Sequence, residues 1–73
     1  SPTDYDDVNN KMYVCNTANN YKVWTNPQTG GTFTTVAVAG FGGTVSAIKV
    51  SPNTANRVFF GITGGRVFRV DNA

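Results

Sequence analysis

The sequence predicts an all-β fold built from antiparallel four-stranded units, and three observations support that prediction. Apolar residues never recur at the i, i+3, i+4, i+7 spacing of an amphipathic helix for more than one turn. Short runs rich in Val, Phe, Tyr, Thr and Ile alternate with Gly, Asn, Asp and Pro, as strands alternate with turns. The chain also matches itself at an offset of 46 residues, the length of one such unit.

Six strands are expected, at residues 11–17, 21–25, 32–38, 44–50, 57–63 and 66–71. The connections between them are short, which favours antiparallel neighbours joined by hairpins. Residues 1–7 are polar and are expected to be turn-like, and the glycine-rich run 40–43 is expected to be a flexible link.

The internal repeat needs no gap. At the offset of 46 residues Asn10 falls on Asn56, Thr17 on Thr63 and Asn26 on Asn72, while residues 11–14 fall on the chemically similar residues 57–60. The offset is close to the roughly 40–50 residues of one blade of a β-propeller.

Several strands are apolar on both faces. In residues 44–50, Val45 and Ala47 are expected to point one way and Ile48 and Val50 the other; in the next strand, Phe59 opposes its apolar neighbours. Such strands need cover on both faces, as stacked blades provide. The prediction is therefore about one and a half blades, a fragment of a larger ring or of an oligomer: residues 1–38 hold the outer three strands of one blade and residues 39–73 the inner three of the next.

Composition limits the remaining possibilities. A chain of 73 residues is marginally stable alone, and with one cysteine and no histidine it offers neither an internal disulfide nor the commonest zinc ligand. The partners expected are the remaining blades or copies of the chain. A net charge of +2 gives no basic stripe for nucleic acid, no apolar run reaches the roughly 20 residues of a membrane span, and no cofactor is expected. Scarce charges and many Thr, Asn and Gly residues favour a secreted or cell-surface location.

A family resemblance follows from residues 45–53 and 57–61, which run as an apolar strand, a Ser-Pro-x-Asn turn and a strand ending in glycine, followed by the hairpin at Gly64 and Gly65. This order resembles the repeat of sortilin-type and BNR (Asp-box) β-propellers. The Asp-box of that family is a structural turn between the third and fourth strands of a blade. Gly30, Thr32 and Phe33 fit its end, but Gln28 replaces its aspartate and Asn26 its serine, so the box is degenerate.

Two groups of side chains are candidate sites, and each has a structural alternative. Asp4, Asp6 and Asp7 could supply carboxylate oxygens to calcium or could form a turn. The aromatic residues Tyr5, Tyr21 and Trp24 could stack on sugar rings or could pack between blades.

The sequence favours a non-catalytic extracellular binding or scaffolding module whose loops bind protein or glycan. The alternative is a fragment of a propeller glycoside hydrolase, for which the resemblance implies a catalytic aspartate in the hairpin after the second strand. Neither equivalent hairpin, at residues 17–20 or 63–65, contains one, so the catalytic acids would lie outside this chain. Self-assembly of the chain through its open edges and apolar faces is a third possibility.

Overall fold

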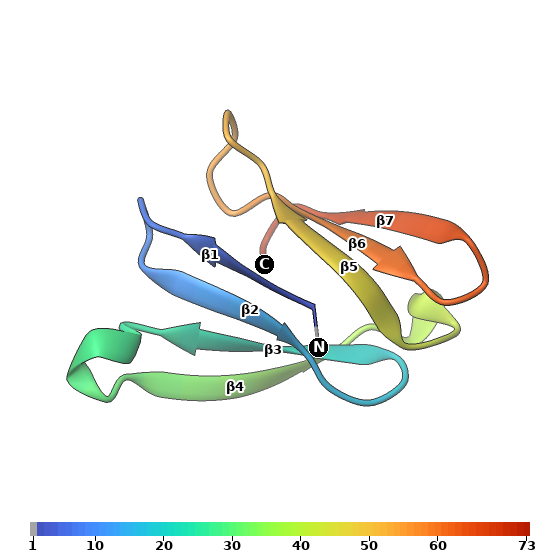
Figure 1. Cartoon of the computed structure of the whole chain (residues 1–73), viewed down its shortest axis with the longest axis horizontal. Helices are drawn as coiled ribbons and strands as arrows, with labels where there is room; N and C mark the ends of the chain where they lie inside the picture. The colour runs from blue at the N-terminus through green and yellow to red at the C-terminus, as the bar shows by residue number, and fades with distance from the viewer. Residues whose placement is uncertain (1) are drawn as a thin grey trace.

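A computed structural model describes residues 2–73 and contains two antiparallel β-sheets packed face to face (Figure 1). The first sheet has the order β1-β2-β3-β4, and the second has the order β5-β6-β7. The strands are β1 (Thr3–Asp6), β2 (Lys11–Cys15), β3 (Asn20–Thr25), β4 (Thr32–Ala37), β5 (Val45–Val50), β6 (Val58–Ile62) and β7 (Arg66–Val70). Single 3-10 turns, η1 (Pro27–Thr29) and η2 (Ala39–Phe41), lie before and after β4. The all-β antiparallel fold is confirmed.

All six expected strands are present, but the sequence analysis missed β1. Thr3–Asp6 pairs with β2 from Thr3↔Val14 to Asp6↔Lys11, so the first sheet has four strands where three were expected. Half of this strand is aspartate, a poor strand former, and only Tyr5 is strongly β-prone. Its conformation comes from pairing with β2, which local composition does not reveal.

The repeat found in the sequence is also present in the strand register. Tyr13↔Val23 in the first sheet corresponds, 46 residues later, to Phe59↔Arg69 in the second, and three further pairs of β2–β3 match pairs of β6–β7 at the same offset. The equivalent turn residues Asn10 and Asn56 both adopt a left-handed backbone, with φ of 55° and 63°. The two sheets are therefore copies of one structural unit.

The two copies face each other through opposite sides. Tyr13 and Tyr21 are fully buried on the inner face of the first sheet, whereas their equivalents Phe59 and Val67 are 36% and 72% exposed on the outer face of the second. The inner face of the second sheet is centred on Phe60 instead. Contacts of this kind are heterologous, because each copy uses a different surface.

The core lies between these inner faces and is rich in aromatic rings. Tyr21 stacks on Phe60 with ring centroids 4.5 Å apart, and Phe41 lies 5.5 Å from Phe60 and 5.3 Å from Phe68. Phe41 belongs to the glycine-rich run that was expected to be flexible, and this expectation is wrong because its ring is fully buried. The Asn19 side chain also holds this link by accepting a 2.7 Å hydrogen bond from the Gly42 amide.

A β-bulge corrects the expected facing of β5. The pairing with β6 shifts between Val45 and Ala47, so Ser46 is an extra residue in the strand. As a result Val45 is buried with Ile48 and Val50 on the inner side, and Ala47 is exposed. The sequence prediction placed Val45 with Ala47 because strict alternation has no bulge.

Tyr13 yields a prediction about alkaline stability. Burial, then the charge of Asp6, then Tyr21, raise the pKa of Tyr13 to about 12. The folded state therefore holds this proton more tightly than the unfolded chain, whose tyrosine pKa is about 10, so the stabilisation is complete below pH 10 and is lost as pH rises towards 12. We expect the unfolding free energy of Tyr13→Phe to fall less than that of the parent chain between pH 10 and pH 12. Urea titrations at a series of pH values measure this difference.

The same variant tests the hydroxyl at neutral pH. The Tyr13 hydroxyl is buried without a hydrogen-bond partner among residues 2–73, so its removal is expected to leave stability unchanged or raise it by up to about 1 kcal/mol. A loss of more than about 1 kcal/mol at pH 7 would show that the hydroxyl has a partner.

Candidate functional site

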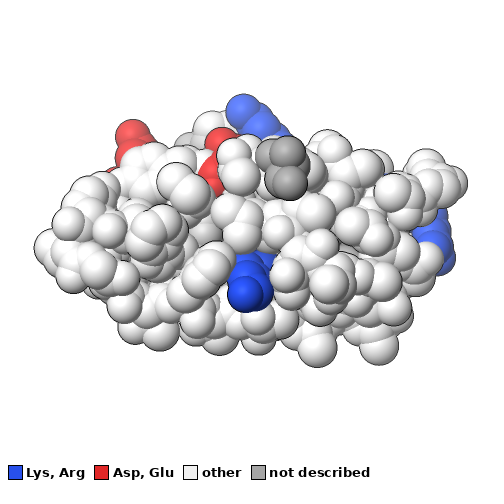
Figure 2. All heavy atoms as spheres, turned by 60° about the horizontal axis from the view of Figure 1, so that its bottom comes forward, with Lys and Arg blue, Asp and Glu red and all other residues white. Residues whose placement is uncertain are grey.

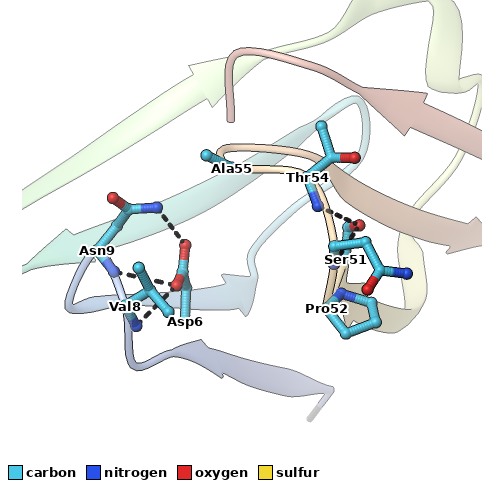
Figure 3. Close-up of a pocket in the computed structure, with 8 residues that line it drawn as sticks. Asp6, Val8, Asn9, Ser51, Pro52, Thr54 and Ala55 are labelled. Atoms are coloured by element: carbon cyan, nitrogen blue, oxygen red, sulfur yellow. Dashed lines mark hydrogen bonds between the residues drawn. The ribbon is translucent and has the colours of Figure 1, made fainter.

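A hollow lies between two equivalent turns, and we call it the turn groove. Its volume is about 250 Å³. The β1–β2 turn forms one wall and the β5–β6 turn the other (Figure 3). The lining residues are Asp6, Val8 and Asn9 on the first side and Ser51, Pro52, Asn53, Thr54 and Ala55 on the second. The groove exists because the packed repeats bring their corresponding turns to the same end of the molecule.

Asp6 shapes the first wall of the turn groove. Its carboxylate accepts hydrogen bonds from the Val8 and Asn9 amides, both at 3.1 Å, and from the Asn9 side chain at 2.9 Å (Figure 3). Burial raises the pKa of Asp6, but the hydrogen bonds from Asn9 and Val8 outweigh it, and the net pKa lies below the ordinary value. Asp6 is therefore an anion that holds the turn in shape.

Ser51 plays the corresponding part in the second wall. Its hydroxyl oxygen accepts hydrogen bonds from the Asn53 and Thr54 amides at 3.3 and 3.1 Å. Ser51 is the position equivalent to Asp6, because Asp6 pairs with Lys11 across the first turn and the Ser51 amide donates to the carbonyl of Arg57, the residue equivalent to Lys11, across the second. A side-chain oxygen at the head of each turn thus fixes both walls.

Asp4 connects the two sheets behind the turn groove. One carboxylate oxygen accepts a 2.8 Å hydrogen bond from the Val50 amide of β5, and the other accepts a 2.9 Å hydrogen bond from the Tyr5 amide. Because β5 is an edge strand, its outward amide has no partner within its own sheet. Asp4 satisfies that amide and ties β1 to β5.

Asp4, Asp6 and Asp7, which were expected either to bind calcium or to form a turn, do not converge on one point. In the part of the chain that the structure describes, no group of three or more His, Cys, Asp or Glu side chains is placed to hold a metal ion. Asp4 and Asp6 bind backbone amides, and Asp7 is exposed on the turn. The turn interpretation accounts for Asp6.

The three aromatic candidates separate. Tyr21 lies in the core between the two sheets, 1% exposed and stacked on Phe60, so its ring is not accessible to a sugar in this structure. Tyr5 and Trp24 lie in one row on the outer face of the first sheet, and Met12 lies between them. The Trp24 indole N–H donates to the Gly30 carbonyl at 3.1 Å, and Gln28 donates to the Tyr5 hydroxyl at 2.9 Å. Sugar binding by Tyr5 and Trp24 stays a prediction.

The expected structural turns are found at the ends of strands. Gly30 ends η1, and Thr32 and Phe33 begin β4, so the degenerate box lies in the β3–β4 connection. Its neighbour Gly31 must be glycine, since a Cβ there would overlap the Thr25 carbonyl oxygen. Gly64 and Gly65, with φ of 96° and 91°, form the β6–β7 hairpin turn.

The sequence analysis missed the apolar side chains of the turn groove. Val8 is 86% exposed at the tip of its turn, and Pro52 and Ala55 lie on the opposite wall. Each residue looks like an ordinary turn residue by itself. The offset of 46 residues was the available signal, since it superimposes the two turns and packed copies must bring them together.

Comparisons of the chain with family models, curated proteins and solved structures find no match. Among the described residues, no helix has the length and apolar character needed to cross a membrane.

Asp6 gives a prediction about acid stability. Because its folded pKa is depressed, the stabilisation is present above the unfolded value of 3.8 and is lost as pH falls through the folded pKa. We expect Asp6→Asn to lower stability at pH 7 and to flatten the decline below about pH 4, measured by urea unfolding. Asp7→Asn changes the same charge at an exposed position and serves as the control. Identical acid profiles for the parent chain and Asp6→Asn would contradict this role.

Asp4 gives a prediction about the connection between sheets. Asp4→Ala leaves the half-buried Val50 amide without its partner and is expected to cost about 1–3 kcal/mol of unfolding free energy. Asp4→Asn keeps an acceptor oxygen and should cost less. Thermal unfolding measures both, together with hydrogen exchange of the Val50 amide, which should accelerate in Asp4→Ala. An unchanged exchange rate would refute the contact.

Proposed function

We propose that the chain is part of a β-propeller, a four-stranded blade followed by three strands of the next, and that it acts as a non-catalytic binding or scaffolding module outside the cell. The observation that supports this proposal is the packing of two equivalent sheets through opposite faces. Successive blades of a propeller must pack in this way, because each blade covers one neighbour with each face.

The arrangement of the first strands also supports the proposal. β1 and β5, the first strands of the two copies, lie against each other and are joined by the hydrogen bond from Val50 to Asp4 (Figure 1). In a propeller the innermost strands of neighbouring blades meet beside the central axis. The resemblance to sortilin-type and BNR repeats leads to the same architecture.

The turn groove is the ligand site in this proposal. Hydroxyl and amide groups of Ser51, Asn53 and Thr54 can donate and accept hydrogen bonds, and the Asp6 carboxylate can accept them. Val8 and Pro52 add exposed apolar surface at the rim. Polar groups beside small apolar side chains suit a peptide loop of a protein partner or a glycan.

The proposal predicts where a ligand perturbs the chain. The test is a nuclear magnetic resonance titration of the labelled chain with short peptides and, separately, with neutral oligosaccharides. We expect shifts confined to the amides of residues 6–9 and 51–55, with no cleavage of the sugar. Ala55→Arg places a long side chain in the turn groove and should abolish the shifts, whereas Thr29→Arg makes the same charge change in the β3–β4 turn and should not.

Other results would overturn the proposal. Shifts that map elsewhere would remove the turn groove as the site, and hydrolysis of an oligosaccharide by the purified chain would establish an enzyme. The absence of shifts with both ligand classes at millimolar concentration would leave the groove a structural hollow.

A further inference from the structure

Each sheet has an outer face that carries exposed apolar side chains. Phe59 and Val67 lie on the outer face of the second sheet, and Tyr5 and Phe33, 39% and 55% exposed, lie on that of the first. The side of the molecule on which β4 lies shows a broad surface with few charged side chains (Figure 2). Apolar side chains exposed on the faces of both sheets offer surface that another molecule could cover.

The packing between the two sheets indicates what covers these faces. Phe59 and Val67 occupy the positions equivalent to Tyr13 and Tyr21, which form the inner face of the first sheet. Conversely, Met12 and Val14 on the outer face of the first sheet are equivalent to Val58 and Phe60 of the second sheet's inner face. The internal packing can therefore be repeated between two copies. The outer face of the second sheet in one copy then covers the outer face of the first sheet in the next copy.

One polar contact between the two sheets involves residues whose equivalents in the repeat have similar side chains. The Lys11 ammonium donates to the Asn56 side-chain oxygen at 3.2 Å, across the two sheets. The equivalent positions hold Arg57, again a cation, and Asn10, again an amide. The Arg57 Nε already binds the Asp71 carboxylate at 2.8 Å, so a contact between Arg57 of one copy and Asn10 of the next would use the other guanidinium N–H groups.

The contact between the first strands also has an equivalent between copies. β1 aligns with β5 at an offset of 45 residues, since the β5–β6 turn is one residue longer than the β1–β2 turn. The contact of Asp4 with Val50 therefore becomes one of Lys49 with Tyr5 of the next copy. Lys49 of one copy is thus placed beside Tyr5 on the outer face of the next, whereas Asp4 and Asp6 stay on the inner face, where they accept hydrogen bonds from amides of their own chain.

The other cations of the two outer faces already have partners. The Lys22 ammonium lies 4.7 Å from the centre of the Phe33 ring, a cation–π contact, and Arg69 is 3.4 Å from the Asp71 carboxylate. Lys22 and Arg69 therefore bring no unpaired charge into the contact between copies.

From these observations we propose that copies of this chain associate head to tail, the outer face of β5–β7 in one copy covering the outer face of β1–β4 in the next. The interface is heterologous, so the assembly closes into a ring or extends as a filament. The proposal rests on the repeat and the faces, and it does not require a ligand in the turn groove.

The test is the mass of the chain in solution, measured by light scattering after size exclusion over a range of concentrations. The parent chain should assemble. Phe59→Glu blocks one face and Phe33→Glu the other, so each variant alone should be monomeric, with association weakened by about tenfold or more. Thr29→Glu adds the same charge at an exposed residue of the β3–β4 turn, outside both faces and outside the turn groove, and should assemble like the parent. Circular dichroism verifies that each variant is folded, and Val67→Glu replaces Phe59→Glu if that variant is not.

Mixing the two blocked variants distinguishes this interface from a symmetric one. Phe59→Glu retains an intact first sheet and Phe33→Glu an intact second sheet, so the mixture should form a dimer that cannot grow. A parent chain that stays monomeric at high concentration would overturn the proposal, including the case in which oligosaccharides bind the outer face instead. Assembly by either variant alone would also overturn the proposal, because it indicates a symmetric contact. A mixture of the two variants that stays monomeric would overturn it as well, because it indicates that a different surface forms the contact.

Discussion

The structure depends on one contact, the burial of the two inner faces against each other around the stacked rings of Tyr21 and Phe60. All of the buried apolar side chains among residues 2–73 belong to this single cluster. Sheets of three and four strands gain little stability without an apolar layer to cover them, and the lone cysteine rules out an internal disulfide. The two repeats therefore fold as one unit, and Phe41, from the link between them, completes the layer.

Packing through opposite faces explains which positions of the repeat match and which do not. The turn residues Asn10 and Asn56 are identical because both need the left-handed backbone that asparagine tolerates. Tyr21 and Val67 differ in size because the first fills the core and the second is exposed. The repeat is thus well preserved in its turns and register, and variable where burial differs between the copies.

The same distinction decides how much of the structure was predictable. Strand positions, hairpins and the offset of 46 residues depend on local pattern, and the sequence predicted them. The strand β1, the burial of Phe41 and the bulge at Ser46 depend on partners far along the chain, and the sequence analysis missed them. The sequence analysis did not decide which face of β3 is buried, so Tyr21 was a candidate for ligand binding.

The candidate site follows from the same contact. Asp6 and Ser51 each fix their own turn, but neither turn alone encloses a groove. The turn groove forms only when the sheets pack and Asp4 ties β1 to β5. A ligand that bridges both walls would therefore bind the packed state and not the separated sheets, and by linkage its binding would stabilise the core. Binding of such a ligand would therefore be coupled to the cohesion of the two repeats, even though the turn groove and the aromatic layer share no side chains.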